Sequence, residues 1–272
     1  MILVRACNGF EELEACVDLQ IEVWGYCEGD VIPRRAFLVA QKIGGQVFGA
    51  FDTALTGAPE QGDAASMVGF ALSLPGVKTG PKCLSGHPES YLHSHMLAVK
   101  DGYRNQGIGA RLKLAQRDEA IGRGIDRIEW TFDPLEIKNA FLNIHKLGAI
   151  VRSYEPDFYG ISSSRLQGGL PTDRLVAEWW LISPRVVAAI GACPSPLQNI
   201  SSLVAARQIV VPAAIYQWKN HEQHRSMAHT VQAENRHMFE KAFSEGLTVV
   251  DFTKDAEGNG IFHLGRWHET EN

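Results

Sequence analysis

A strand, a short polar turn and a glycine-rich helix start follow one another between residues 96 and 114, and this order constrains the chain most. The apolar run 96–99 predicts a strand, and Gly107 and Gly109 stand where the next helix begins. The first N–H groups of a helix have no partner within it, and the helix dipole adds partial positive charge there. Glycines leave those groups open to an anion, and Arg104 adds a positive charge beside them. Residues 104–110 therefore predict an anion-binding site, which we call the anion cradle.

The kind of anion follows from the details of this motif. No Gly-Lys-Ser/Thr follows the glycines, so the segment is not a nucleotide-triphosphate loop, and Leu112 replaces the third glycine of the dinucleotide fingerprint. The pattern Arg104-x-x-Gly107-x-Gly109 after a strand resembles the pyrophosphate-binding motif of the GNAT acyltransferases, which move acyl groups from coenzyme A to amines. The resemblance implies a CoA-dependent N-acyltransferase that uses acetyl-CoA or another acyl-CoA as co-substrate.

Composition narrows the class of protein. The 272 residues are 45% hydrophobic and 21% charged, as in ordinary globular proteins. A formal net charge of −5 argues against a nucleic-acid surface, which needs clustered basic residues. Five scattered cysteines without a C-x-x-C pair favour reduced thiols, and we see no signal peptide and no apolar run long enough to span a membrane. We expect a cytoplasmic protein without nucleic-acid partner, membrane partner or bound metal.

The hydrophobic pattern predicts a mixture of strands and helices. Strands are expected at 1–5, 46–51, 67–74, 91–99, 127–132, 150–153 and 175–181, and helices at 11–24, 34–42, 107–123 and 137–147. The Gly/Ala-rich segment 56–65 is expected to close a hairpin between the second and third strands. Beyond residue 184 the pattern predicts a helix at 186–192, a Pro/Ser-rich link at 194–202, a strand at 208–213, a helix at 229–245 and a hairpin across 258–260.

This element order is similar to that of the GNAT fold over residues 1–183. The resemblance implies an α/β fold with a mixed, twisted sheet, helices on both faces, and a gap between the parallel strands 91–99 and 127–132 that takes the pantetheine arm. We expect a GNAT domain at 1–183 and a small α+β extension at 184–272 that forms a distinct unit packed on it. The extension could form a homodimer contact or cover the acceptor site.

The resemblance also assigns residues to the cofactor. Backbone groups of strand 91–99 would bond the pantetheine amides, the anion cradle would hold the pyrophosphate, and Asn139 and Ala140 of helix 137–147 would face the cofactor. The residues expected to bind it are Leu97, Ala98, Val99, Arg104, Asn105, Gln106, Gly107, Ile108, Gly109, Ala110 and Asn139.

Transfer to an amine needs a group that accepts its proton. Strand alternation places His93, His95, Leu97 and Val99 on one side of their strand. At the position of His93 several histone-modifying GNAT enzymes carry a glutamate base, and imidazole accepts a proton near neutral pH. His93 is therefore the candidate catalytic base, and Glu129 on the neighbouring strand is the second. For each of these groups a purely structural role is the alternative.

Departure of the CoA thiolate needs a proton donor. Many GNAT enzymes carry a tyrosine four residues before the glycine that ends the helix after the second of the two parallel strands. Counting back from Gly148 gives Ile144, which has no proton to donate. Either water assists the thiolate, or a tyrosine arrives from elsewhere. Tyr154 and Tyr159 on the following loop are the candidates, and the sequence favours neither.

The connection from residue 154 to 174 is long for a compact domain, and in GNAT folds the corresponding link overhangs the acceptor site. Arg165 and Arg174 on it could clamp a carboxylate in a bidentate manner, with surface ion pairs as the alternative. We therefore expect a small-molecule primary amine as acceptor, with a free amino acid as one candidate. The sequence does not decide between acetyl, succinyl and longer acyl groups.

Other classes of function stay open. A glycine-rich turn without any ligand would explain the cradle motif. Ile144 in place of tyrosine fits a regulatory CoA-binding domain that has lost its chemistry, whereas His93 argues for an enzyme. The pair His93-x-His95 could also supply two ligands of a metal-dependent hydrolase, provided that further ligands converge there.

Overall fold

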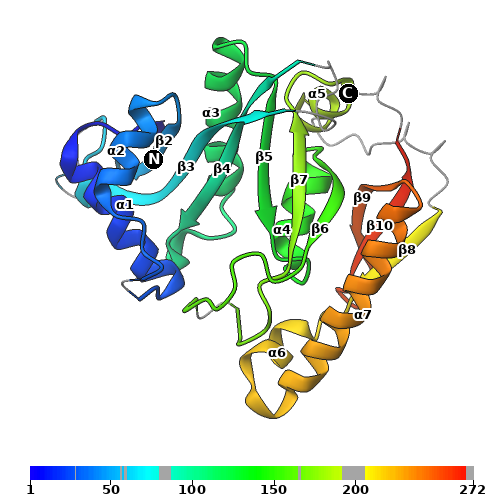
Figure 1. The fold of residues 1–272 in the computed structure, drawn as a ribbon. Helices are drawn as coiled ribbons and strands as arrows, with labels where there is room; N and C mark the ends of the chain where they lie inside the picture. The colour runs from blue at the N-terminus through cyan, green and yellow to red at the C-terminus, as the bar shows by residue number, and fades with distance from the viewer. Residues whose placement is uncertain are drawn as a thin grey trace. The chain divides into compact units, whose positions relative to one another are not determined.

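The structure, a computed structural model, describes residues 1–27, 29–55, 57, 60–79, 87–164, 167–191 and 206–267 (Figure 1). Its contacts divide the chain into two compact units. One unit contains residues 1–129 and 163–165, and the other contains residues 130–162 and 166–272. The division falls inside one strand, β5 (Arg127–Phe132).

The first unit is a mixed sheet with helices on both faces. Its strand order is β1-β2-β3-β4-β5, antiparallel as far as β4, whereas β4 and β5 run parallel and pair at Leu92–Ile128 and His93–Glu129. The predicted fold class and the parallel pairing are thus confirmed. The predicted gap between β4 and β5, which would take the pantetheine arm, stays a prediction. The other elements are β1 (Ile2–Ala6), α1 (Gly9–Trp24), α2 (Arg34–Lys42), β2 (Gln46–Asp52), β3 (Met67–Lys78), β4 (Glu89–Val99) and α3 (Ile108–Gly122).

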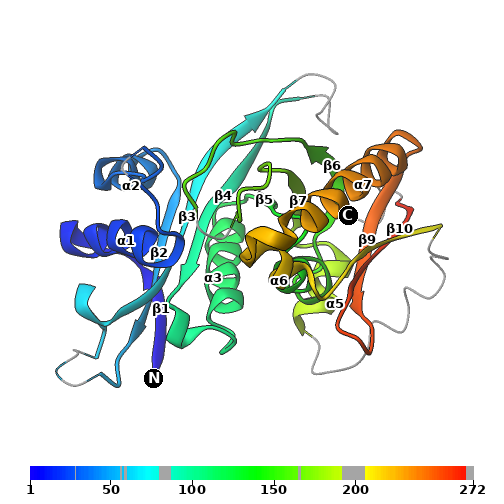
Figure 2. The same cartoon turned by 90° about the horizontal axis from the view of Figure 1, so that it is seen from below.

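Two apolar clusters cover the two faces of this sheet, because side chains alternate along each strand. Leu13 of α1 and Phe37 of α2 pack with Phe70 on one face, and Ile108 and Leu112 of α3 pack on the other. Figure 2 shows the same division, with α1 and α2 on one side of the strands and α3 on the opposite side.

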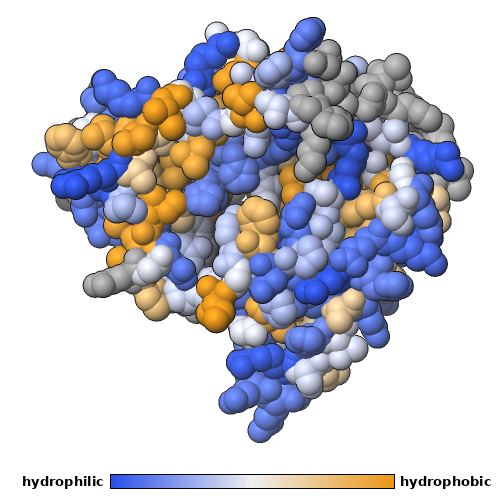
Figure 3. All heavy atoms as spheres, viewed as in Figure 1, coloured by the Kyte–Doolittle hydropathy of each residue, from blue (hydrophilic) through white to orange (hydrophobic). Residues whose placement is uncertain are grey.

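Helices α1 and α2 also keep apolar side chains on their outer surface. Phe10, Ile21, Val39 and Ile43 are each at least half exposed. Figure 3 shows apolar residues gathered over this part of the first unit. The two helices are therefore not strictly amphipathic, although their buried faces carry the core.

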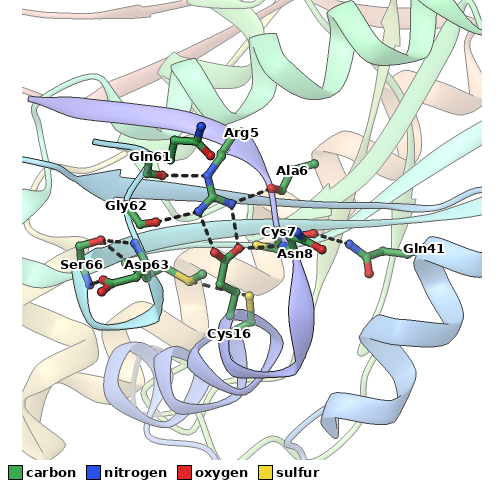
Figure 4. A network of polar contacts seen from close by, with 12 residues as sticks. Arg5, Ala6, Cys7, Asn8, Cys16, Gln41, Gln61, Gly62, Asp63 and Ser66 are labelled. Atoms are coloured by element: carbon green, nitrogen blue, oxygen red, sulfur yellow. Dashed lines mark hydrogen bonds and ion pairs between the residues drawn. The ribbon is translucent and has the colours of Figure 1, made fainter. Parts of the chain in front are cut away.

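An arginine fixes the start of the first unit (Figure 4). Arg5 on β1 makes a bidentate pair with Glu12 of α1 at 2.7 and 2.8 Å and donates to the backbone oxygens of Gln61 and Gly62. Its guanidinium also lies 4.0 Å from the centroid of the Phe51 ring. These contacts tie the loop before β3 to β1 and α1. They support the predicted hairpin between β2 and β3, of which residues 56, 58 and 59 lie outside the described residues.

One extra residue interrupts the register between β3 and β4. Leu72 pairs with Met96 and Ser73 pairs with Ser94, so His95 is left between the two pairs. Such a β-bulge bends the strand and shifts the alternation of its side chains. The residues of one strand do not reveal a bulge, because a bulge is defined by the pairing of two strands.

The second unit has the strand order β5-β7-β6-β9-β10-β8. Its pairs β7–β6, β6–β9, β9–β10 and β10–β8 are antiparallel. The short helix α6 was not predicted, and the other elements lie close to their predicted ranges. They are α4 (Ile137–Ala140), β6 (Ile150–Glu155), β7 (Arg174–Trp180), α5 (Pro184–Gly191), β8 (Arg207–Val211), α6 (Ile215–Asn220), α7 (Arg225–Ser244), β9 (Leu247–Lys254) and β10 (Gly260–Arg266).

The residues after 184 share this unit with β6 and β7, although we expected a distinct unit. Val151 of β6 pairs with Val249 of β9, so the added strands continue the same sheet. Arg236 of α7 forms a bidentate pair with the buried Asp173 at 2.6 and 2.9 Å. The boundary at 183/184, which rests on the extent of the family resemblance, stays a prediction. Within the described part of the chain, no helix has the length and apolar character that crossing a membrane requires.

Candidate functional site

The anion cradle is an exposed turn in which two residues have a left-handed backbone conformation. Asn105 has φ 62° and Gly107 has φ 77°, and residues 104–107 are all exposed. Gly107 is the N-cap of α3, where no side chain caps the helix. A Cβ added at Gly107 would meet nothing within 4 Å. The first amides of α3 therefore face open space, as binding of an anion requires.

The cation of the cradle is already partnered. Arg104 Nη2 lies 2.7 Å from Asp101 Oδ1, and Nε donates to the Val99 backbone oxygen at 3.3 Å. Both side chains of the ion pair are largely exposed, so the pair contributes little stability and exchanges readily. Tyr103 holds the turn in place, since its hydroxyl donates to Asp52 Oδ2 at 2.9 Å. An incoming phosphate would compete with Asp101 for Arg104.

The end of β4 presents alternate backbone groups to its two edges. Lys100 N–H donates to Val68 O on β3, and the Ala98 carbonyl approaches Gly69 of β3. Since residues of an antiparallel pair alternate, the N–H and C=O of Leu97 and Val99 point to the other edge of β4. This agrees with their predicted role toward the pantetheine amides. Ala98, by contrast, turns its backbone to β3 and its side chain into the core.

The bulge changes which side chains share a face. His93 is in register with Leu74, which packs against the cluster under α1 and α2. Leu97 and Val99 pack against the cluster under α3. The prediction that these three β4 residues and His95 lie on one side is therefore wrong, because the extra residue at His95 inverts the alternation beyond it.

His93 and His95 are adjacent and half-buried, with ring centroids 5.9 Å apart. Burial, followed by electrostatic interactions with His95 and Lys113, lowers the pKa of His93 to about 4. Burial also lowers the pKa of His95. Both imidazoles are therefore neutral at physiological pH and have a lone pair for a proton.

A buried polar network joins α3 to the bulge, and the sequence did not predict it. Lys113 Nζ donates to Ser94 Oγ at 2.9 Å, and Ser94 Oγ donates to Gln116 Oε1 at 2.9 Å. Gln46 of β2 donates to the Gln116 backbone oxygen at 2.8 Å. Burial lowers the pKa of Lys113 well below its usual value. The polar residues at positions 113 and 116, beside the apolar stripe of α3, are the sequence feature from which this network could have been predicted.

Glu129 is buried in an ion-pair cluster. Its Oε1 accepts a bond from Lys78 Nζ and lies 3.5 Å from Arg127 Nε. Arg127 also pairs with Glu89 at 3.2 Å. Two cations thus compensate the charge of Glu129, which lies beside His93 in the sheet. Its catalytic role remains the second candidate.

The helix after β5 changes from an α-helix to a π-helix at the position where a proton donor to the CoA thiolate was expected. Residues Phe141–Lys146 form a π-helical turn after α4, with Leu147 N–H bonded to Leu142 O. Such turns are frequent at functional sites. Ile144 lies fully buried within it. Asn139, on the preceding turn, is exposed and accessible to a ligand, in line with its predicted role.

The burial of Ile144 leads to a prediction about restoring a tyrosine there. We expect Ile144→Tyr to destabilise the protein by about 1–3 kcal/mol rather than raise kcat, because a larger side chain overfills a packed core. Denaturant unfolding measures the loss. Ile43→Tyr is the matched control, since Ile43 is 58% exposed. Equal stabilities for the two variants would contradict this account of position 144.

The loop between β6 and β7 carries the predicted carboxylate clamp. Arg174 donates to the Asp173 backbone oxygen at 2.8 Å and to Gln167 Oε1 at 3.3 Å, and it lies 5.2 Å from the Tyr159 ring centroid. Arg165 lies outside the described residues. The clamp of two arginines therefore stays a prediction, and of the two side chains the structure describes Arg174.

The metal-hydrolase alternative needs a third ligand near the two histidines of β4. In the described ranges, no group of three or more His, Cys, Asp and Glu side chains is arranged to hold a metal ion. The pair His93 and His95 thus gains no support as a metal site there.

Comparison with known proteins agrees with this geometry. The model of the acetyltransferase (GNAT) family matches residues 21–143, a range that includes β4, the cradle and Asn139. NAA60 of Arabidopsis thaliana, solved with a bisubstrate analogue, is 14% identical, with a TM-score of 0.50, over 66% of this chain and 99% of that one. The ribosomal-protein-S18-alanine N-acetyltransferase of Escherichia coli is 15% identical, with a TM-score of 0.46, over 66% of this chain and 93% of that one. None of the curated proteins matches the sequence.

Proposed function

Because the chain belongs to the acetyltransferase (GNAT) family and is a CoA-dependent N-acetyltransferase, we propose that it transfers an acyl group to the primary amine of a small molecule. The observation that carries the proposal is the cradle, where Gly107 leaves the first amides of α3 uncapped beside Arg104. The pyrophosphate of coenzyme A is an anion that such a site accepts. Leu97 and Val99 would then bond the pantetheine arm through their backbone.

In the proposed reaction the amine nitrogen attacks the thioester carbon and its proton passes to His93. The neutral imidazole supports this role, because a protonated one could accept nothing. The C–S bond then breaks, and its electron pair goes to the sulfur, which needs a proton to leave as a thiol. The products are an amide and coenzyme A.

Arg174 supports an acceptor that carries a carboxylate. Its guanidinium is half-buried and is oriented by Asp173 and Gln167, so less side-chain entropy is lost when it binds an anion. A free amino acid combines an amine with a carboxylate and is the acceptor class that we propose. An amino group of a protein is the competing acceptor class.

A screen of amines against acetyl-CoA and succinyl-CoA, with thiol release as readout, tests the proposed function. We expect amino acids to be faster than the matched amines without a carboxylate. Tight CoA binding without thiol release for any amine would instead indicate the regulatory CoA-binding domain. We further propose a cytoplasmic location, which fits the free thiols of Cys7, Cys16 and Cys27.

If a phosphate of coenzyme A replaces Asp101 as the partner of Arg104, changes at either residue should alter the affinity for coenzyme A. Arg104→Ala should weaken CoA binding by about 1–3 kcal/mol, the range for losing a charge-assisted hydrogen bond. Asp101→Asn should strengthen it, by no more than about 1 kcal/mol, because it removes a surface competitor of the phosphate. Calorimetric titration with coenzyme A measures both. Weaker binding by Asp101→Asn would show that the acid positions Arg104 rather than competing for it.

A further inference from the structure

Helices α1 and α2 carry an outer surface that neither the core nor the proposed reaction uses, and we call it the α1/α2 surface. Phe10 and Ile21 of α1 are at least half exposed on it, and so are Val39 and Ile43 at the end of α2. Figure 3 shows apolar residues gathered over this part of the first unit. Exposed apolar side chains that gather on one face of a protein are typical of an interaction site.

The two helices form one continuous surface. Arg34 of α2 reaches across to α1, where its guanidinium lies 5.3 Å from the Phe10 ring centroid and its Nη1 lies 3.1 Å from Glu14 Oε2. Figure 2 shows the helices side by side on the same face of the sheet. Both belong to the first unit, so their outer faces can bind one partner together.

The charges on the α1/α2 surface are separated by helix. The exposed charges of α1 are all acidic, and those of α2 are all basic. They are Glu11, Glu14, Asp18 and Glu22 on α1, and Arg34, Arg35 and Lys42 on α2. In a two-fold symmetric contact the same surface comes from both copies, so α1 of each copy can lie against α2 of the other. The surface is therefore complementary to itself in charge.

The spacing of the charges fits this exchange. Glu11 and Asp18 of α1 are seven residues apart, and so are Arg35 and Lys42 of α2. Seven residues make nearly two helical turns, so the two charges of each helix lie on one side, about 10 Å apart. Among the residues that the structure describes, none of these four side chains forms an ion pair within the chain. The two acids of one copy thus match the two bases of another, whether the helices meet parallel or antiparallel.

We propose that the chain forms a homodimer through the α1/α2 surface, with the acidic α1 of one copy against the basic α2 of the other. The apolar side chains among the charges then leave water, and the charges determine how the two copies are oriented. An anionic lipid surface would attract α2 but repel the acids of α1, so a second copy suits both helices better. The proposal goes beyond the proposed function and does not depend on it.

Sedimentation velocity of the full chain tests the contact. Between about 1 and 200 μM the wild type should change from one chain to two, because protein interfaces of standard size reach at least micromolar affinity. Val39→Glu places a carboxylate among the apolar side chains and should weaken the dimer at least about tenfold. Val187→Glu on α5 is the matched control, since Val39 and Val187 are 53% and 51% exposed. It should leave the dimer unchanged.

Reversing the charges tests the pairing of the helices directly. Glu11→Lys with Asp18→Lys makes α1 resemble the basic α2, and Arg35→Glu with Lys42→Glu makes α2 resemble the acidic α1. Each double variant alone should be monomeric over the same concentrations, because like charges would face each other. An equal mixture of the two should dimerise again, since each α1 then meets an α2 of opposite charge. Recovery in the mixture would also show that both variants are folded.

Several results would overturn the proposal. They are a wild type that sediments as one chain at the highest concentration, double variants that remain dimeric alone, and a mixture that stays monomeric. A monomeric wild type that cosediments with vesicles containing phosphatidylserine would instead assign the surface to a membrane. Thiol release from acetyl-CoA is measured separately. A dimer that releases no thiol would contradict the proposed function and leave the dimer contact standing.

Discussion

Replacing His93 with alanine is expected to lower kcat/KM about 100-fold or more, while the affinity for coenzyme A stays unchanged. A positioned acid or base contributes about 10²–10⁴ to the rate. Burial gives His93 a pKa of about 4, which makes it a weak base, so we expect the lower end of this range. Steady-state kinetics with the best acceptor of the amine screen measures the loss, and His95→Gln is the matched control on the same strand.

The pH dependence of the wild type gives an independent check. The base must be neutral, and its pKa of about 4 lies below the ordinary value of 6.5. Expressed per neutral amine, kcat/KM should therefore stay level through pH 6.5 and fall only as the pH approaches 4. A fall centred near 6.5 would mean that the working base is an ordinary, solvated histidine or that substrate binding restores the usual value.

The same shift affects stability, with a sign that can be worked out. Between pH 6.5 and 4 the unfolded chain protonates His93 while the folded chain keeps it neutral. The unfolded state then binds more protons, so the free energy of unfolding decreases as the pH falls through this window. His93→Gln should flatten that part of the curve. A curve that keeps its slope in the variant would assign the effect to other groups, of which His95 is the nearest.

The sequence predicted the parts of the fold that depend on local pattern. The strand, turn and helix around the cradle can be predicted from residues 96–114, because Gly107 and the periodic apolar residues of the strand and the helix lie within one short segment. The change at Ile144 was also visible, since it depends on counting back from Gly148. What the count could not show is the π-helical turn at Phe141–Lys146, because six residues are too few to distinguish its period from that of an α-helix.

Features that depend on pairing between distant segments were not predictable. The bulge at His95 exists only relative to β3, so strict alternation assigned Leu97 and Val99 to the wrong side. The residues after 184 were expected to stand apart, because nothing in their own sequence indicates that Val249 extends the sheet beside Val151.

A valine at position 107 is expected to abolish measurable binding of coenzyme A, a loss of at least about 100-fold or ~2.7 kcal/mol, since several charge-assisted bonds to the first amides of α3 would be lost together. Gly107 has φ 77°, and a Cβ there meets nothing in the protein itself. The side chain would therefore stand in the space where the anion has to sit. A β-branched residue also strains this backbone conformation by about 1–2 kcal/mol, which calorimetry alone cannot separate from loss of the site.

Gly124 provides the control for that strain. It follows the other end of α3 with φ 76° and equally open space around a Cβ, so Gly124→Val has the same conformational cost away from the cradle. Both variants should lose similar unfolding free energy, but only Gly107→Val should lose CoA binding. Gly107→Asn refines the comparison, because asparagine tolerates a left-handed backbone while its side chain still fills the space. If Gly107→Asn bound coenzyme A as tightly as the wild type, the open space above residue 107 would not be the pyrophosphate site.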